Sequence, residues 1–128
     1  MGKNERLKSR KLIEQVFEGG KGFNVFPFRV AYKVIEIYPE HLQAGFGVSS
    51  RNFRKAVNRN RIRRMMREVY RLQKQVLTCK LKEKNINLAL FLMYTGKEVP
   101  EYELIKEKIS LILQRFIKKL DEKDPSNM

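Results

Sequence analysis

The stretch from Arg51 to Arg71 constrains the fold of this chain more than any other. It holds nine basic residues and one acid, Glu68, and so carries more than half of the chain's formal net charge of +14. Apolar residues interrupt it at helical spacing, and at about 100° per residue they fall on one arc: Ile62, Met65, Met66, Val69 and Leu72. The opposite arc carries Arg59, Asn60, Arg63, Arg64, Arg67 and Arg71. This pattern predicts a helix over about residues 55–75 with one buried face and one guanidinium face.

The excess of arginine on that helix favours a polyanionic partner. A planar guanidinium group binds phosphate through two parallel hydrogen bonds, whereas a face that is only solvated is served by mixed charges. The sequence pI of about 10.1 indicates nucleic acid first and an acidic membrane surface second. A solvated charged face is the alternative interpretation of the same residues.

Length and composition predict a single domain in a reducing cytoplasm. The 128 residues suffice for one modest core, and a hydrophobic content of 42% is that of a folded protein. No run of about 18 apolar residues is present and the N-terminus lacks a secretory signal, so neither a membrane span nor export is expected. The single cysteine, Cys79, excludes an internal disulfide bond.

The hydrophobic pattern along the chain predicts an α+β protein. The expected elements are helices over 5–18, 55–75 and 100–120, strands over 26–37, 42–48 and 86–94, and a lysine-rich connection over 76–85. The first two strands are expected to pair as a hairpin around a turn at residues 37–41. This helix-hairpin-helix-strand-helix order predicts a single two-layer α/β sandwich, with the helices on one side of a small mixed sheet. The domain should span residues 1–120, followed by a disordered tail over 121–128.

No residue pattern indicates an autonomous catalyst. His41 is the only histidine and no serine or cysteine motif accompanies it, so neither a nucleophilic triad nor a zinc site is expected. The remaining function is nucleic-acid binding. A basic helix beside a sheet with exposed aromatic side chains can bind a sugar-phosphate backbone while the aromatic rings stack on bases. Phe17 and Tyr32 are the aromatics expected beside that surface. Each of the two is also explained as an ordinary core or strand residue.

The central motif resembles that of a known family. Residues 55–71, Lys-Ala-Val-Asn-Arg-Asn-Arg-Ile-Arg-Arg-Met-Met-Arg-Glu-Val-Tyr-Arg, are similar to the arginine-rich "RNR" motif of the bacterial ribonuclease P protein component. Other segments also fall where that family has similar residues: Arg6-Leu7, Val16-Phe17 before Gly19-Gly20-Lys21, the strand ending Val30-Ala31-Tyr32, and Gly45-Phe-Gly-Val-Ser. The resemblance covers about residues 5–117, and its central motif is highly specific.

The resemblance implies a basic subunit of ribonuclease P that binds the catalytic RNA and the 5′ leader of precursor tRNA. In that family the RNA, with its bound Mg²⁺, performs the endonucleolytic cleavage that forms the mature tRNA 5′ end. The protein itself is therefore expected to hold no catalytic residue, cofactor or metal. The implied partners are ribonuclease P RNA and precursor tRNA in the cytoplasm, with no membrane and no obligatory protein partner. The family is also known for a left-handed crossover at the basic helix, whereas the general rule for parallel strands predicts a right-handed one.

Two groups of residues correspond to the functional surfaces of the family. The RNA-binding surface is expected to comprise Arg51, Lys55, Arg59, Asn60, Arg61, Arg63, Arg64, Arg67 and Arg71. The leader cleft, between the first helix and the sheet, is expected to comprise Ile13, Phe17 and Tyr32. The chain departs from the family pattern at two positions. Ile13 stands where many members carry a second cleft phenylalanine, and Arg54 stands where many carry glycine before the basic helix.

Two other functions fit the basic helix. A ribosomal protein that binds rRNA would show the same basic face, and a duplex-DNA-binding protein would place the helix in a major groove. Reconstitution of precursor-tRNA cleavage separates the ribosomal alternative from ribonuclease P. Competition between duplex DNA and structured RNA separates the DNA-binding alternative.

Overall fold

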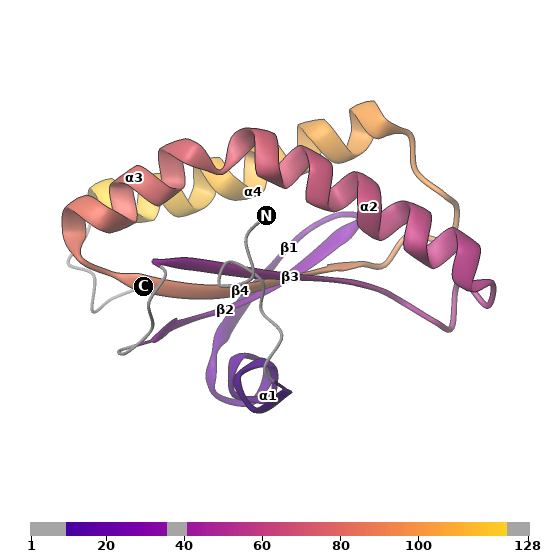
Figure 1. The fold of residues 1–128 in the computed structure, drawn as a ribbon, viewed down its shortest axis with the longest axis horizontal. Helices are drawn as coiled ribbons and strands as arrows, with labels where there is room; N and C mark the ends of the chain where they lie inside the picture. Colours follow the sequence, from indigo (N-terminus) through magenta and orange to yellow (C-terminus); the bar gives the residue numbers. More distant parts are fainter. Residues whose placement is uncertain (1–9, 36–40, 123–128) are drawn as a thin grey trace.

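The computed structural model describes residues 10–35 and 41–122, which form four helices and four strands (Figure 1). In chain order these are α1 (Arg10–Gly19), β1 (Lys21–Val25), β2 (Phe28–Ile35), β3 (Leu42–Val48), α2 (Ala56–Gln73), α3 (Gln75–Lys84), β4 (Asn87–Tyr94) and α4 (Tyr102–Glu122). The start of the first predicted helix, most of the turn predicted at 37–41 and residues 123–128 of the predicted tail lie outside the described residues. Residues 121 and 122, which the sequence pattern places in the tail, belong to α4.

The four strands form one mixed sheet in the order β1-β2-β4-β3. The pairs β1–β2 and β2–β4 are antiparallel and β3–β4 is parallel, so that Leu92 lies between Val30 and Phe46. The predicted hairpin of the strands over 26–37 and 42–48, which correspond to β2 and β3, is therefore wrong, because β4 separates them. β4 is apolar on both faces, which suits the centre of a sheet. The hairpin that does form joins β1 to β2 through a turn that contains the cis peptide bond Phe26–Pro27.

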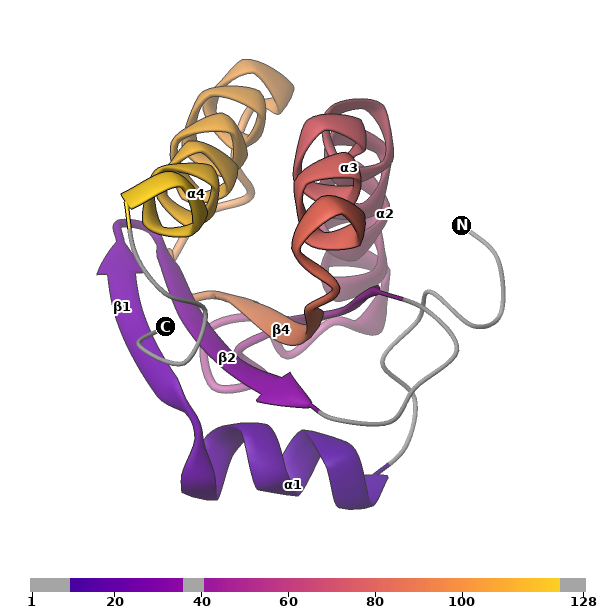
Figure 2. The ribbon, with the colours of Figure 1, turned by 90° about the vertical axis from the view of Figure 1, so that its left-hand side faces the viewer.

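Helices cover both faces of this sheet (Figure 2). α2, α3 and α4 lie on one face, and α1 lies alone on the other. The expectation that all helices share one side is wrong for α1, whose Val16 packs against Ala89 of β4. The side chains of β4 alternate between the two faces, so that Leu88, Leu90 and Leu92 point toward the three later helices.

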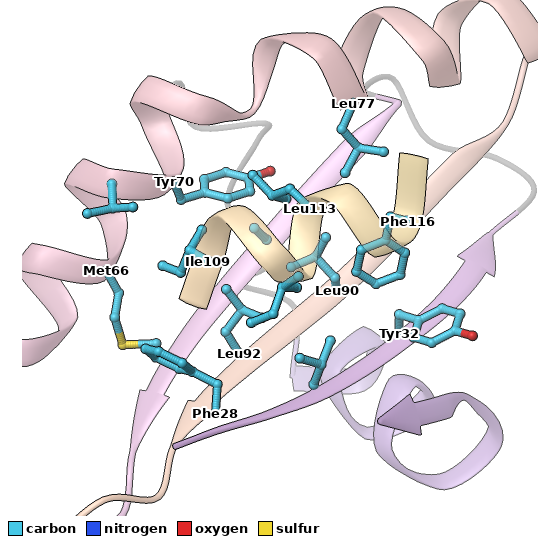
Figure 3. Packing of buried hydrophobic residues seen from close by; sticks show 14 of the residues in the cluster. Phe28, Tyr32, Met66, Tyr70, Leu77, Leu90, Leu92, Ile109, Leu113 and Phe116 are labelled. Carbon is cyan, nitrogen blue, oxygen red and sulfur yellow. The ribbon is translucent and has the colours of Figure 1, made fainter. Parts of the chain in front are cut away.

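The main core lies between the sheet and those three helices (Figure 3). Its large buried side chains include Phe28 and Tyr32 from β2, Met66 and Tyr70 from α2, Leu77 from α3, Leu90 and Leu92 from β4, and Ile109 and Phe116 from α4. Full burial of one such side chain stabilises the fold by about 1.5–3 kcal/mol. The core therefore fixes how α2 is rotated on the sheet, and so decides which of its side chains face solvent.

A helix that the sequence pattern missed, α3, follows α2 with only Lys74 between them. The lysine-rich connection predicted over residues 76–85 is therefore wrong. Leu77 and Leu81, four residues apart, are fully buried and hold this helix on the core. Asn85 ends it in the left-handed conformation with a φ of 52°, which asparagine tolerates better than most residues.

The predicted fold class, α+β with a small mixed sheet, is confirmed. Because β3 and β4 run parallel, α2 and α3 form the crossover between them, and the left hand expected for this crossover stays a prediction. Across residues 10–35 and 41–122, no helix combines the length and apolar character needed to cross a membrane.

Candidate nucleic-acid interface

The buried side of α2 determines which residues it turns outward. Its buried residues are Ile62, Met66, Val69 and Tyr70. The Tyr70 ring meets Phe46 of β3 with ring centroids 5.4 Å apart. The predicted apolar stripe included Leu72, but that side chain is 59% exposed and Tyr70 takes its place against the sheet. The helix is thus rotated from the expected position toward Tyr70.

The opposite side of α2 presents what we call the basic ridge: Asn60, Arg61, Arg63, Arg64, Arg67 and Arg71. Asn60, Arg64, Arg67 and Arg71 are exposed, and at about 100° per residue they lie within an arc of about 60°. Arg61 and Arg63 flank this row on its two sides. The structure therefore brings these six predicted residues together on the solvent side of one rigid helix.

Internal contacts engage only part of the ridge. Arg71 Nη2 lies 3.0 Å from Glu68 Oε1 in an exposed ion pair, and Arg63 donates a hydrogen bond to Asn60 Oδ1. In the part of the chain that the structure describes, Arg61 and Arg64 form no hydrogen bond or ion pair. Their guanidinium groups can therefore meet an external anion without first giving up a protein partner.

Arg59 differs from the ridge residues because it binds the protein's own backbone. Its Nη1 donates hydrogen bonds of 2.8 Å to the carbonyl oxygens of Phe53 and Arg54. The side chain is only partly exposed. Arg59 therefore ties the loop before α2 to the first turn of the helix, and this contact includes the position at which Arg54 departs from the family pattern.

The loop over residues 49–55 carries Arg51 and Lys55, both exposed, to the N-terminal end of α2. Asn52 Nδ2 donates hydrogen bonds of 3.2 Å to the carbonyl oxygens of Thr95 and Gly96. These bonds fix the loop to the chain just after β4. The Asn52 side chain thus holds the loop that carries Arg51 and Lys55 at the N-terminal end of α2.

A cleft of about 470 Å³ lies between α1 and the adjoining face of the sheet. Its lining residues are Val16, Phe17, Gly20, Lys21, Gly22, Phe23, Asn24, Arg29, Val30, Ala31 and Met93. Phe17 is 49% exposed and meets Phe91 edge to face with ring centroids 5.2 Å apart. Gly47 of β3 leaves room for this ring, since a Cβ there would lie 2.9 Å from Phe91 Cε1. Lys21 and Arg29 are exposed, so the cleft combines the Phe17 ring with cations.

Phe17 is the one predicted cleft residue that lines this cleft. Ile13 is partly buried and packs against the small cluster of Val16 and Ala89. Its side chain therefore helps to hold α1 on the sheet.

Tyr32 does not share a surface with Phe17, and that part of the prediction is wrong. Tyr32 is 3% exposed, and its ring meets Phe116 of α4 at a centroid distance of 4.9 Å. Its hydroxyl accepts a hydrogen bond of 2.8 Å from Lys119 Nζ. Successive residues of a strand point to opposite faces, and Tyr32 falls on the face that α4 covers, whereas its neighbour Ala31 lines the cleft.

Sequence reasoning missed Arg29 and Met93 in the lining of the cleft, and it missed Phe91, which packs against Phe17. β4 is nearly all apolar, so its pattern does not show which residues face α1. Arg29 alternates with the buried residues Phe28 and Val30 of β2, and this alternation was the signal that could have found it.

The groups that line these two surfaces are guanidinium, ammonium and aromatic side chains, which bind phosphate and stack on bases. A basic ridge and an aromatic cleft on one small α+β domain define an RNA-binding protein. The family model described as Ribonuclease P matches residues 1–116. The chain belongs to this ribonuclease P protein family, which serves in a tRNA-processing ribonucleoprotein.

Curated relatives agree with this assignment. The ribonuclease P protein component of Porphyromonas gingivalis is 36% identical over 120 residues, which cover 91% of this chain and 85% of that protein. The corresponding protein of Chlorobium phaeobacteroides is 32% identical over 125 residues, which cover 89% and 86% of the two chains.

Solved structures share the fold. The ribonuclease P protein of Staphylococcus aureus superposes with a TM-score of 0.69 at 21% identity, covering 92% of this chain and 98% of that chain. The ribonuclease P protein of Thermotoga maritima gives a TM-score of 0.69 at 23% identity, covering 87% and 96%. At these identities the likeness establishes the architecture alone.

Proposed function

We propose that this chain is the protein subunit of ribonuclease P, which binds the catalytic RNA through the basic ridge and the 5′ leader of precursor tRNA through the cleft beside α1. In this way it assists the endonucleolytic removal of the leader. The observation that carries the proposal is the orientation of α2: Ile62, Met66, Val69 and Tyr70 are buried while the ridge is exposed. Membership of the family supports the enzyme, and the geometry supports the division of labour between the two surfaces.

The ridge would act by neutralising phosphate groups of the RNA subunit. Each cation that replaces a condensed counterion makes binding more sensitive to salt. If the ridge and the loop before it meet about six phosphates, affinity should fall about a thousandfold between 50 and 200 mM salt.

The cleft would select precursor over mature tRNA, because only the precursor carries a leader. A leader base would stack on the exposed part of the Phe17 ring, which Phe91 supports, and Lys21 and Arg29 would neutralise the phosphates beside it. A base stacked on an aromatic side chain contributes about 1–3 kcal/mol. The cleft therefore offers enough binding energy to distinguish the two forms of tRNA.

Cleavage is assigned to the RNA subunit, which holds the Mg²⁺. Mg²⁺ takes oxygen ligands, whereas the ridge presents guanidinium groups. Within the described ranges, no cluster of three or more His, Cys, Asp or Glu side chains is placed to hold a metal ion. The partners that we propose are ribonuclease P RNA and precursor tRNA in the cytoplasm, with no obligatory protein partner.

Reconstitution tests the proposal. Adding the chain to ribonuclease P RNA at low Mg²⁺ should restore cleavage of precursor tRNA. A variant with Arg64, Arg67 and Arg71 changed to Ala is the matched control, because it keeps the buried side of α2 and should fold without restoring cleavage. Failure of the unaltered protein to restore cleavage would overturn the proposal and support the ribosomal alternative, which the family comparisons do not favour.

A further inference from the structure

Phe26 occupies an unusual position at the tip of the β1–β2 hairpin. It is 78% exposed, the highest value among the large hydrophobic side chains of the described residues. Turn positions usually hold glycine, proline, asparagine, aspartate or serine, each for a conformational reason. A phenylalanine in this turn packs little of its ring against the protein, so the core does not account for it.

Behind Phe26 lies a pocket of about 610 Å³. Its lining residues are Phe26, Pro27, Tyr94, Thr95, Gly96, Lys97, Glu98, Leu104 and Lys108. One wall is apolar, with Pro27 and Leu104, and two lysines, Lys97 and Lys108, provide positive charge opposite the single carboxylate of Glu98. The pocket thus suits a flat apolar group that is attached to an anion.

The wall of this pocket is held in place by internal hydrogen bonds. The backbone N–H and the hydroxyl of Thr95 donate to the Pro27 carbonyl oxygen at 2.8 and 2.9 Å. The Tyr94 hydroxyl donates to the Glu98 carbonyl oxygen at 2.7 Å. Burial raises the pKa of Tyr94, with a smaller contribution from the Glu98 carboxylate, so the phenol keeps its proton and remains a donor. The pocket is therefore formed before any ligand arrives.

The pocket and the cleft beside α1 are linked by shared lining residues. A smaller hollow of about 240 Å³ is lined by Asn24, Phe26, Phe28, Arg29 and Thr95. Asn24 and Arg29 also line the cleft, and Phe26 and Thr95 also line the pocket. The three hollows therefore adjoin one another in a track that leads from the cleft beside α1 round the hairpin tip to the pocket at α4.

The track also reaches the loop that leads into the basic ridge. Thr95 and Gly96, which line the pocket, accept the two hydrogen bonds from Asn52. Arg51 is the neighbour of Asn52 in this loop and is exposed. A strand that leaves the cleft along the track therefore passes from the Phe17 and Phe91 rings toward the cations at the start of α2.

We propose that the pocket at the hairpin tip is a second binding site for the single-stranded leader, in which one base stacks on Phe26 while Arg29, Lys97 and Lys108 neutralise the neighbouring phosphates. This inference rests on the function proposed above and extends it, because the leader is held at two separated aromatic positions rather than in the cleft alone. Single-stranded RNA fits the track because every base offers a flat face and every nucleotide carries one phosphate.

Binding of precursor and mature tRNA to the reconstituted enzyme tests this site. Phe26→Ala should weaken precursor binding about tenfold, as expected for one lost stacked base, and leave mature tRNA binding unchanged. Phe26→Tyr keeps a ring and should bind precursor as the unaltered protein does. Leu111→Ala, which removes another exposed apolar side chain on α4, is the control and should have no effect on either tRNA.

A photo-crosslinking amino acid at position 26 locates the contact directly. It should crosslink to a leader nucleotide different from the one that is captured from position 17. Crosslinks to ribonuclease P RNA alone, or an unchanged precursor affinity in Phe26→Ala, would overturn the second site.

Failure of this inference is distinguishable from failure of the proposed function. If only the second site is wrong, Phe17→Ala still lowers the preference for precursor over mature tRNA while Phe26→Ala does not. If the proposed function is wrong, the unaltered protein itself neither restores cleavage nor prefers precursor tRNA.

Discussion

Phe17 of α1 and Phe91 of β4 meet edge to face, with ring centroids 5.2 Å apart. An edge-to-face pair contributes about 0.5–1.5 kcal/mol beyond the area it buries, so the contact orients both rings as well as packing them. Phe17 stays 49% exposed, and the open part of its ring is available for stacking. The pair therefore acts as one unit in the cleft, and its two members should respond to mutation as a unit.

A double-mutant cycle on this pair tests that coupling. Phe17→Leu and Phe91→Leu should each weaken binding of precursor tRNA by the reconstituted enzyme, because each change removes an aromatic face and disorients the other ring. The double variant should lose less than the two single losses combined. Losses that add within about 0.3–0.5 kcal/mol would show that the two rings act independently.

The outward arginines of the ridge should determine how steeply RNA binding depends on salt. Arg64→Ala and Arg67→Ala should each flatten the plot of log affinity against log salt by about one unit, because each removes one phosphate contact. Filter-binding titrations from 50 to 200 mM salt measure the slope. Leu72→Ala, at a neighbouring exposed position without charge, is the control, and a slope unchanged in all three variants would remove the ridge from the interface.

Arg59 should behave differently, since it bonds the protein's own backbone. Arg59→Ala removes two hydrogen bonds from a charged donor and should lower the free energy of unfolding by about 1–2 kcal/mol. Arg59→Lys keeps the charge and can reach one of the two carbonyl oxygens, so its free energy of unfolding should lie between those of the unaltered protein and Arg59→Ala. Urea denaturation followed by circular dichroism measures the difference. Equal stability of all three proteins would mean that the loop holds its position without this contact.

The ion pair of Glu68 with Arg71 should restrain RNA binding more than it stabilises the fold. Both side chains are about half exposed, and such pairs contribute about 0.2–1 kcal/mol. Glu68→Gln removes the only acid within the stretch from Arg51 to Arg71 and frees Arg71. We expect RNA affinity to rise about threefold, with a change in unfolding free energy below about 0.5 kcal/mol. A fall in affinity would show that Glu68 positions Arg71 for the RNA.

Substitutions at two glycines should distinguish an effect on stability from an effect on the cleft. A Cβ at Gly20 would collide with the backbone carbonyl oxygens of Val16 and Tyr32, so Gly20→Ala should destabilise the protein by about 1–3 kcal/mol. The nearest atoms to a Cβ at Gly47 would be those of the Phe91 ring and the Met93 methyl group, at 2.9 to 3.1 Å. Gly47→Ala should therefore keep most of its stability and weaken precursor binding, because the displaced ring narrows the cleft. Thermal unfolding and tRNA binding, measured on both variants, check this contrast.

The sequence predicted the structure best where apolar residues recurred at one regular spacing without interruption. The ridge residues from Asn60 to Arg71 share one side because apolar residues recur beneath them. The change from Leu72 to Tyr70 on the buried side was not predictable from hydrophobicity, because the space above Phe46 of β3 decides it. α3 was missed because Lys80, Lys82 and Lys84 dominate its second half and hide the four-residue spacing of Leu77 and Leu81.

Long-range pairing was the part that local patterns could not supply. The strands that contain Tyr32 and Phe46 are neighbours in the chain, yet β4 arrives later and inserts between them. That insertion follows from burial on both faces of β4, which depends on α1 covering Ala89 from below. Tyr32 was assigned to the wrong surface for the same reason, since the face of β2 that α1 covers is unknown until the sheet is assembled.

β4 fixes the distance between the Phe17–Phe91 pair and the loop before α2. Phe91 on this strand contributes to the aromatic pair, and the carbonyl groups just beyond its end anchor Asn52 and the loop before α2. About four residues of extended chain, roughly 13 Å, separate these points. A strand that is hydrogen-bonded on both edges neither stretches nor slips. β4 therefore keeps the Phe17–Phe91 pair and α2 at a constant separation.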